Sequence, residues 1–299
     1  MALERASTQA IGKPWGRTDL RPWGDVPKDG AAVGELWFER AAGDAPEPAL
    51  RLKLLFTAEP LSIQVHPDDD WAHRVGLPHG KTEAWYILAA QSGAEIAIGL
   101  KRRLSQSQLR ASIEAGSIAD ELGWRSVQAG DVGFVPAGTI HTIGAGLVVA
   151  EIQQRSDATF RLFDHGRRRA LQVDEALAVA DAGPAESQRP PRRLSNARSL
   201  LVASPYFVLE RIDLRPISSW QLRAESETWV LILEGHAQVG PFGASVGDVI
   251  FIEAERTAIT AGPDGMSGLL AYVGAEPNPG LLRELAGLSA GIPIPAMER

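Results

Sequence analysis

Short stretches in which apolar and polar residues alternate recur along most of the chain. Such alternation is typical of β-strands that bury one face, and a brief apolar run is typical of a strand buried on both faces. The pattern predicts strands in the first half of the chain at residues 34–40, 51–57, 83–90 and 94–100. The same alternating pattern covers most of residues 200–275, so the chain is expected to be mainly β.

A few segments depart from this strand pattern. In residues 105–122 the apolar side chains recur at roughly helical spacing, and Ser105 occupies the position of an N-cap. Residues 174–182 and 281–288 predict two further short helices. The first 30 residues show little periodicity and are predicted to form loops.

An internal repeat indicates how the strands are organised. GDVGFVPA at residues 130–137 recurs as GDVIFIEA at 247–254, and TEAWYIL at 82–88 recurs as ETWVLIL at 227–233. The motifs lie further apart in the first copy because that copy contains the helical segment. Two copies of a strand-rich unit with such turns predict two cupin-type jelly-roll barrels, that is, double-stranded β-helices.

The repeat and the composition of the segment between its copies predict three parts. Residues 1–183 are expected to form a catalytic cupin domain that carries a metal site and the helical insertion at 105–122. Residues 184–199, rich in proline and charge, are expected to be a linker. Residues 200–299 are expected to form a degenerate second cupin domain without a metal.

Composition narrows the classes of partner and of metal ligand. The net charge of -7 argues against nucleic-acid binding, because proteins that neutralise phosphates carry an excess of lysine and arginine. The absence of cysteine leaves histidine, carboxylate and amide groups as metal donors. No apolar run reaches the length of a membrane span or resembles a signal peptide, so we expect a cytoplasmic protein without a membrane partner. The sequence makes no prediction of oligomeric state.

A candidate metal site begins where a predicted strand ends in Pro67. Gln64 and His66 alternate along that strand and therefore point to the same side, and Glu83 begins the next apolar strand. The spacing G-D-x-x-x-x-P-x-x-x-x-H, typical of a second cupin motif, supplies His141. Two imidazoles, a carboxylate and an amide suit a divalent ion of the zinc class, with at least one coordination position left open.

The second copy of the repeat lacks the corresponding donors. Ala258 stands at the position equivalent to His141, and no histidine precedes Glu227 at the required place. His236 is predicted to be exposed in a hairpin turn. One metal site per chain is therefore expected, in the first copy.

Several segments of the first half resemble motifs of the type I mannose-6-phosphate isomerases, also called phosphomannose isomerases, in their short bacterial form. The matching segments are LSIQVHPDDDWA, GKTEAWYI, FVPAGTIHTIGAGLVVAEIQQ and SDATFRLFDHGR, with weaker similarity in KPWG and GELWF. They cover most of residues 12–170. The family consists of zinc-dependent cupins that interconvert mannose 6-phosphate and fructose 6-phosphate. The resemblance implies one Zn²⁺ per chain, bound by Gln64, His66, Glu83 and His141.

The resemblance also implies roles for residues around the metal. Arg161 corresponds to the family's arginine that is thought to assist proton transfer, and Asp157 belongs to the same motif. Lys81 and Ser62 correspond to family positions beside the zinc ligands. Arg155 stands where short bacterial members often have asparagine.

Interconversion of an aldose and a ketose moves a proton between C1 and C2 through an enediol, and this requires a base and an electrophile. A divalent ion can polarise the substrate oxygens, and Arg161 and Lys81 would add positive charge where the enediolate develops. Asp157 and Glu151 are both candidates for the base.

Recognition of the phosphate is less sharply predicted by the sequence. The candidate donors are Ser62, Lys81, Arg155 and Arg167. The arginine run at residues 167–169 is expected to lie in a solvated loop, with a possible role in steering an anionic sugar.

Other functions stay open at this stage. The chain could be an isomerase of a non-phosphorylated aldose, or a cupin that binds sugars for regulation without catalysis. An Fe(II) dioxygenase would usually need three histidines and a glutamate, so Gln64 argues against that class.

Overall fold

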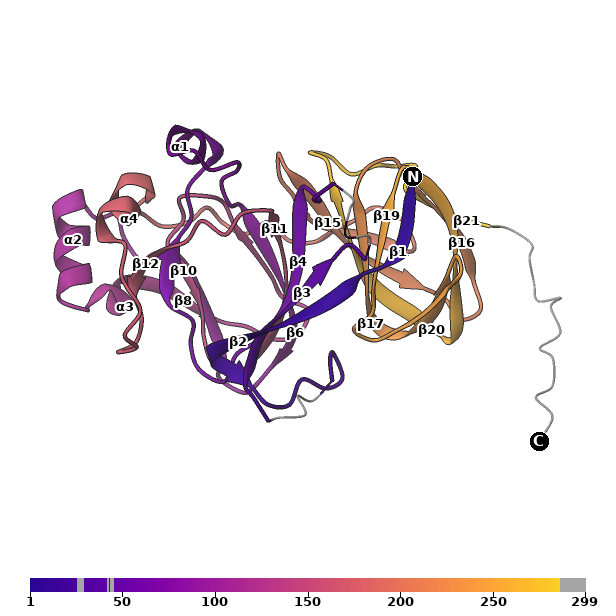
Figure 1. The fold of residues 1–299 in the computed structure, drawn as a ribbon, viewed down its shortest axis with the longest axis horizontal. Coiled ribbons are helices and arrows are strands. Elements are labelled where there is room, and N and C mark those ends of the chain that lie inside the picture. Colours follow the sequence, from indigo (N-terminus) through magenta and orange to yellow (C-terminus); the bar gives the residue numbers. More distant parts are fainter. Residues whose placement is uncertain (26–29, 42, 44–45, 286–299) are drawn as a thin grey trace.

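The computed structural model describes residues 1–25, 30–41, 43 and 46–285. Within these residues the protein is mainly β, with three sheets and four short helices, as the alternating sequence pattern predicted (Figure 1). The three sheets and few helices are consistent with a cupin fold.

A six-stranded sheet lies at the centre of the molecule. Its strands run in the order β2 (Ser7–Arg17), β3 (Val33–Glu39), β4 (Leu50–Phe56), β11 (Leu147–Gln154), β6 (Glu83–Ala90) and β9 (Val132–Val135). Every neighbouring pair is antiparallel. All residues of β4 and β11 are buried, because the sheet is covered on both faces.

A five-stranded sheet packs against one face of this central sheet. Its strands are β12 (Phe160–Phe163), β5 (Ile63–Val65), β10 (His141–Ile143), β7 (Glu95–Leu100) and β8 (Leu122–Ser126). Trp15, Leu55, Trp85 and Ile96 belong to the apolar cluster between the two sheets. The candidate metal ligands come from strands of both sheets.

Three short helices pack against strands of the five-stranded sheet: α2 (Gln106–Glu114), α3 (Ile118–Glu121) and α4 (Val173–Val179) (Figure 1). Leu109 and Ile113 form the buried side of α2, and Ser105 caps its N-terminus in a capping box with Gln108. The helical insertion and the predicted cap are therefore confirmed, but the insertion is two helices interrupted at residues 115–117, and Leu122 already belongs to β8. The sequence analysis missed a fourth helix, α1 (Asp69–Arg74), whose N-cap Asp68 accepts a hydrogen bond from the amide of Trp71.

A ten-stranded sheet made mostly of the second half of the chain covers the other face of the central sheet. Its main path runs through β1 (Ala2–Arg5), β19 (Val249–Glu253), β17 (Thr228–Val239), β20 (Glu255–Val273), β15 (Phe207–Leu214), β14 (Arg198–Ala203) and β13 (Arg192–Arg193). Three more strands extend it: β16 (Ser219–Ala224), β18 (Phe242–Ser245) and β21 (Leu282–Glu284).

Apolar side chains join the two halves of the chain into one core. Phe38 and Phe56 of the central sheet share a buried cluster with Trp229 and Phe251 of the ten-stranded sheet. A separate apolar cluster, which includes Val230 and Ile250, lies within the second half. The second half therefore buries an apolar face of the sheet that carries Glu83.

The prediction of loops in the first 30 residues was wrong over β1 and β2. Strand β1 pairs with β19, with Ala2 opposite Glu253, while β2 pairs with β3 in the central sheet. Neither strand has one clearly buried face, since β1 is half-buried and most of β2 is exposed, so their sequences carry little period.

Two further predictions in the second half were wrong in part. The segment Leu282–Glu284 is not helical but pairs with β16, and residues 286–288 of the predicted helix lie outside the described residues. His236 is exposed, as predicted, but it lies within β17 opposite Ser245 and not in a turn.

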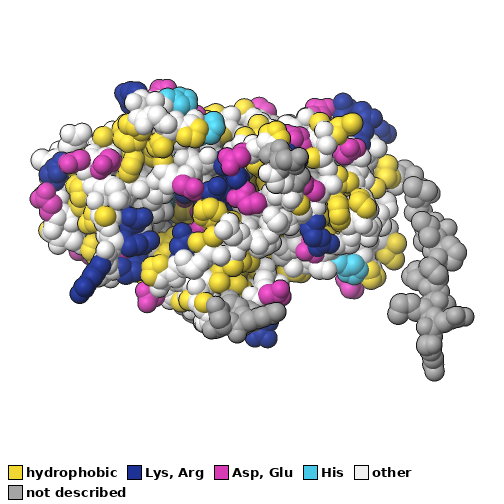
Figure 2. Space-filling view, in the orientation of Figure 1, with side chains coloured by type: hydrophobic (Ala, Val, Ile, Leu, Met, Phe, Trp, Pro, Cys, Tyr) yellow, Lys and Arg dark blue, Asp and Glu magenta, His cyan; other side chains and the backbone are white. Residues whose placement is uncertain are grey.

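Charged residues lie mainly on the surface. Figure 2 shows basic and acidic side chains interspersed over the face seen in Figure 1. No helix among the described residues combines the length and apolar character needed to cross a lipid bilayer.

Candidate metal centre and substrate cavity

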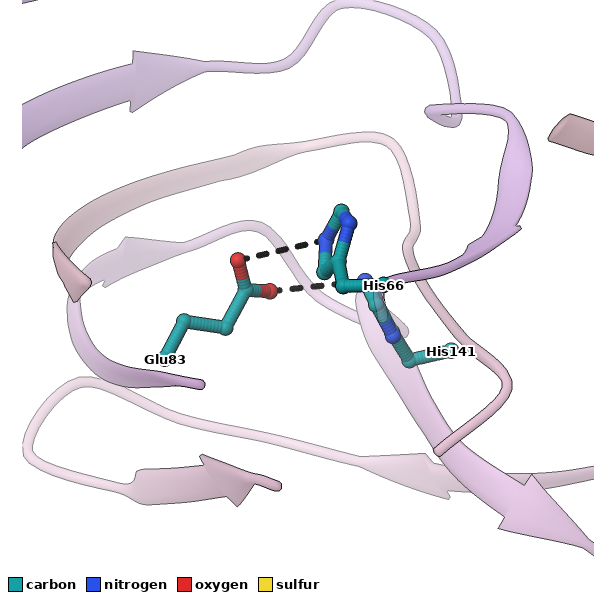
Figure 3. Close-up of side chains that lie close together, drawn as sticks. All are labelled: His66, Glu83 and His141. Carbon is teal, nitrogen blue, oxygen red and sulfur yellow. Dashed lines mark ion pairs between the residues drawn. The ribbon is translucent and has the colours of Figure 1, made fainter. Parts of the chain in front are cut away.

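His66, Glu83 and His141 meet in the interior of the first half of the chain, and each is at most 1 % exposed. The Nε2 atom of each imidazole lies 3.4 Å from a different carboxylate oxygen of Glu83 (Figure 3). One ligand atom from each of the three residues lies within 4.8 Å of the others, so the group could hold a metal ion.

Strand pairing and sheet packing bring these residues together. His141, the first residue of β10, lies directly opposite Gln64 on β5, and His66 follows β5 immediately. Glu83, the first residue of β6, comes from the central sheet, which faces β5 and β10. The two sheets thus present an imidazole pair and a carboxylate to one another.

Gln64 is placed to complete the donor set. Its side-chain Nε2 lies 3.3 Å from Nε2 of His141, and its Oε1 accepts a hydrogen bond of 3.3 Å from the Ser62 hydroxyl. The two ends of a side-chain amide exchange by a half-turn, and the Ser62 hydroxyl can equally accept from the amide nitrogen. The Gln64 oxygen can therefore face the imidazoles.

Backbone carbonyls orient both imidazoles. Nδ1 of His66 lies 2.8 Å from the carbonyl oxygen of Ala158, and Nδ1 of His141 lies 2.8 Å from that of Thr139. Each Nδ1 must carry the proton in these contacts, which leaves the Nε2 lone pair directed at Glu83. Protein metal sites use the same arrangement to fix the coordinating nitrogen.

The protonation states also fit metal binding. Burial, followed by the charge of Lys81, lowers the pKa of His66 to about 3, and burial lowers the pKa of His141. Burial alone would raise the pKa of Glu83, but Lys81 and the two imidazoles hold it well below its ordinary value. Neutral imidazoles and an ionised carboxylate are the forms that bind metals.

Lys81 brings a positive charge into the donor group. Its Nζ lies 2.8 Å from Oε2 of Glu83 and 3.1 Å from Nε2 of His66. Although burial disfavours an ammonium ion, the negative charge of Glu83 raises the pKa of Lys81. Within the described residues Oε2 of Glu83 makes no hydrogen bond of normal geometry, and the ammonium of Lys81 is the cation that faces it. The nitrogen and oxygen donors suit a divalent metal ion.

A cavity of about 290 Å³ opens beside this group, at the small end of the range for ligand sites. Gln64 and Lys81 connect the cavity with the buried donor group. The predicted site residues that line it are Ser62, Gln64, Lys81, Glu151, Asp157 and Arg161.

The two candidate bases have different surroundings. Glu151 is buried, and burial together with the nearby charge of Glu83 raises its pKa. One oxygen of Glu151 lies 3.3 Å from Nζ of Lys53. Asp157 is paired with Arg51 at 2.6 Å, and its side chain is 65 % exposed.

Arg155 is not among the residues that line the cavity, contrary to its predicted role in substrate binding. Its guanidinium lies 2.6 Å from the carboxylate of Glu39, on the rim of the central sheet. It was predicted as a cationic donor near the metal motifs, but it follows the last residue of β11 and its guanidinium is bound by Glu39.

Arg161 lines the cavity from the strand next to Gln64. The two residues lie opposite each other in the pairing of β12 with β5, so their side chains leave the sheet on the same face. The guanidinium donates to the carbonyl oxygen of Ala170 at 3.0 Å, and its buried Nε has no partner among the described residues. Burial, followed by the charge of Arg169, lowers the pKa of Arg161.

Sequence reasoning missed a set of charged and aromatic residues that also line the cavity: Lys13, Trp15, Glu35, Trp37, Lys53 and Arg169. Glu35 lies 3.1 Å from Lys13 and 3.9 Å from Lys53. A signal was present for Glu35 and Lys53, because each is a charge flanked on both sides by apolar residues or glycine in a largely apolar strand. Such charges are rarely buried without a partner or a function.

The glutamate of the second copy has a different environment. Trp229 donates its indole N–H to Glu227 at 2.8 Å, just as Trp85 donates to Glu83 at 3.1 Å, so the Glu-x-Trp repeat is also a structural one. Glu227, however, accepts hydrogen bonds from the backbone amides of Ala49 and Leu50 at 2.6 and 3.0 Å. It binds the start of β4 in the first half of the chain.

Comparison with known sequences confirms the resemblance to mannose-6-phosphate isomerases. No protein-family model matches the chain. A mannose-6-phosphate isomerase of Streptococcus mutans is 39 % identical over 168 residues, which cover 54 % of this chain and 53 % of that protein. A probable mannose-6-phosphate isomerase of Bacillus subtilis is 36 % identical over 196 residues, 60 % of this chain and 62 % of that protein. The matches thus span between half and two thirds of the length of these relatives.

Solved structures share the fold over a larger part of the chain. A mannose 6-phosphate isomerase from Bacillus subtilis superposes with a TM-score of 0.79 at 24 % identity, covering 91 % of this chain and 100 % of the other. A putative mannosephosphate isomerase from Archaeoglobus fulgidus gives a TM-score of 0.72 at 16 % identity, covering 91 % and 97 %. The similarity therefore extends through both halves of the chain.

Proposed function

From this similarity to mannose-6-phosphate isomerases, we propose that the chain is a metal-dependent aldose–ketose isomerase that interconverts mannose 6-phosphate and fructose 6-phosphate. The observation that carries the proposal is the buried group of His66, Glu83 and His141 beside a cavity lined by cationic side chains. Relatives named as mannose-6-phosphate isomerases support the choice of reaction.

The metal is proposed to be zinc, one ion per chain, held by Gln64, His66, Glu83 and His141. The neutral imidazoles, the ionised carboxylate and the adjacent amide support this set, since zinc favours nitrogen and oxygen donors when cysteine is absent. When bound, the ion would supply a Lewis acid for the oxygens on C1 and C2 of the sugar.

The architecture is proposed to consist of two cupin-type barrels. The first would occupy residues 1–183 with the helical insertion at 105–122, the linker residues 184–199, and the second residues 200–299. The repeated Glu-x-Trp contact and the separate apolar cluster of the second half support this division. Strand β1 is an exception to it, because it pairs with β19 of the second half.

The residues of the cavity can perform the remaining parts of the reaction. Glu151 is proposed as the base that moves the proton between C1 and C2, since its raised pKa gives the carboxylate more basicity than an ordinary glutamate has. Asp157 is less suited because Arg51 pairs with it. Lys81 and Arg161 would place fixed positive charge near the enediolate, where preorganised charge lowers the barrier most.

Ser62 is proposed to have two contacts in the cavity, one with the sugar and one with the side chain of Gln64. Its hydroxyl lines the cavity, where it can contact the sugar, and it lies within hydrogen-bonding distance of the Gln64 amide, whose nitrogen it would accept from when the Gln64 oxygen faces the metal. Lys53, only 3.3 Å from Glu151, would hold the base in position.

The test is an isomerase assay on the purified protein, with its metal content measured in the same sample. Mannose 6-phosphate is supplied, and fructose 6-phosphate is detected by a coupled enzyme. Turnover should be lost on chelation and restored by a stoichiometric amount of zinc. Failure of the zinc-loaded protein to convert mannose 6-phosphate would overturn the proposal. Conversion of free mannose in its place would instead indicate an isomerase of non-phosphorylated aldoses, and binding without turnover a regulatory cupin.

A further inference from the structure

One buried carboxylate, that of Asp164, binds two arginines of the run that follows β12. Asp164 has a side chain only 2 % exposed, and it accepts from Nε of Arg167 at 3.1 Å and from Nε of Arg169 at 2.8 Å. A second guanidinium nitrogen of Arg169 also lies 2.5 Å from this carboxylate. The run is therefore not a freely solvated loop, because both side chains are held by the same anchor.

The two arginines leave this anchor in different directions. Arg167 continues to the carbonyl oxygen of Pro60 at 2.8 Å and to Glu59 at 3.4 Å, and it is not among the residues that line the cavity. Arg169 lines the cavity, and its side chain is 32 % exposed. Its two bonds to Asp164 use Nε and one terminal nitrogen, so the other terminal nitrogen is available to a ligand.

The charges around the cavity are balanced everywhere except on this side. Lys81 is paired with Glu83, Lys13 with Glu35, and Lys53 with Glu151. Arg161, by contrast, has no ion-pair partner among the described residues, while Arg167 is paired with both Glu59 and Asp164, and Arg169 is paired with Asp164 alone. The side of the cavity formed by Arg161 and Arg169 therefore carries one uncompensated positive charge. Arg161 donates to the carbonyl oxygen of Ala170, the residue after Arg169, which places the two arginines near each other.

We propose that Arg169 binds the anionic group of the substrate and makes the site specific for sugars that carry a phosphate at the end remote from the reacting carbons. The inference rests on the proposed isomerase function and adds a specificity-determining residue to it. Arg161 lies opposite Gln64 and so serves the reacting carbons, whereas Arg169 comes from the loop that follows β12, and its side chain is 32 % exposed. A sugar with C1 and C2 at the buried donor group would direct C6 and its phosphate away from that group, toward the accessible side.

Asp164 explains why an arginine is suited to this position. A guanidinium can engage a carboxylate through two nitrogens and still present a third to a phosphate oxygen, which a lysine cannot do. The buried anchor also fixes the side chain before the substrate arrives, so little rotamer entropy is lost on binding.

The experiment compares Arg169→Ala with Arg167→Ala in the zinc-loaded, full-length chain. Each variant removes one of the two arginines that pair with Asp164, so the two variants are matched for the loss of one ion pair to this carboxylate. Arg169→Ala should raise KM for mannose 6-phosphate roughly 10- to 100-fold with kcat within about threefold of the original, as for loss of a charge-assisted contact made equally in ground and transition states. Arg167→Ala should leave KM within about twofold.

A second measurement uses inorganic phosphate as the probe and does not depend on turnover. Calorimetry, or competitive inhibition where activity is present, should show phosphate binding that Arg169→Ala weakens and Arg167→Ala retains. Equal effects of the two substitutions on phosphate affinity would overturn the role of Arg169. A chain that binds phosphate through Arg169 but does not isomerise mannose 6-phosphate would refute the proposed function and leave this inference standing.

Discussion

Glu227 offers the sharpest test of how the second half of the chain supports the first. Its carboxylate is 5 % exposed and accepts three hydrogen bonds, from the amides of Ala49 and Leu50 and from the indole of Trp229. The substitution Glu227→Ala leaves these three donors without a partner at the joint between the two halves. The next residue, Arg51, pairs with Asp157 in the cavity wall.

The expected loss in the free energy of unfolding follows from the number and kind of hydrogen bonds that Glu227→Ala removes. A hydrogen bond to a charged group contributes about 1.5–3 kcal/mol, so three bonds have an upper limit near ~9 kcal/mol. Removal of the carboxylate also removes the cost of burying it, a cost that raises the pKa of Glu227. We therefore expect Glu227→Ala to lower the free energy of unfolding by about 3–5 kcal/mol, the usual range for breaking a buried charged interaction.

Urea unfolding followed by tryptophan fluorescence and by circular dichroism measures this change. The matched control is Glu225→Ala two residues earlier, because Glu225 forms an exposed pair with Arg223 at 2.9 Å. Such pairs contribute about 0–1 kcal/mol. Glu227→Gln, which keeps one acceptor oxygen, should fall between the two alanine variants. If Glu227→Ala lowers the free energy of unfolding no more than Glu225→Ala does, the inference that Glu227 stabilises the contact between the two halves of the chain is refuted.

Three other substitutions test the site and its surroundings. His141→Ala should reduce bound zinc below one ion per chain by metal analysis while the circular dichroism spectrum stays unchanged; full zinc occupancy would contradict the donor set. Glu151→Gln should lower kcat by about 10²-fold or more with KM little changed, as for loss of a general base, and steady-state kinetics with retained zinc checks this. Burial acts to raise the pKa of Asp164, but Arg169 and Arg167 lower it below 3.8, so its stabilising effect is complete above that value and is lost as pH falls through the folded-state pKa. Asp164→Asn should therefore destabilise the protein at pH 7, and the difference should shrink as the pH falls below 3.8, as measured by urea unfolding; a difference independent of pH would count against the ion pairs.

The donor group shows how far a sequence can predict a site. Gln64 and His66 had to share a side because strand residues alternate, and a motif spacing supplied His141. The structure brings His66 and His141 to Glu83 and leaves Gln64 adjacent to them. Local geometry and a specific motif were sufficient here because Glu83 and His141 each begin a strand, while Gln64 lies within β5 and His66 directly after it.

The remaining cavity residues depend on how the sheets face one another. Lys53 and Glu35 are charges in largely apolar strands, and only the pairing of β3 with β4 shows that both point into the same space. Arg155 and Arg169 were misjudged for the same reason. Their positions in the sequence did not indicate that Glu39 would bind Arg155. Nor did they indicate that Asp164 would hold Arg169 at the cavity.

By itself, the sequence determined the mainly β character, the presence of helices within 105–122 and near 174–182, the repeat, and the three residues His66, Glu83 and His141 that the structure brings together, because each follows from a short-range period or a fixed spacing. Tertiary structure decided which strands the first 17 residues join, which arginine reaches the cavity, and that Glu227 binds backbone amides of the other half of the chain. These outcomes depend on contacts between residues far apart in the sequence or on the direction of a loop. No local pattern encodes them, because the free energy that selects them arises only when the sheets pack together.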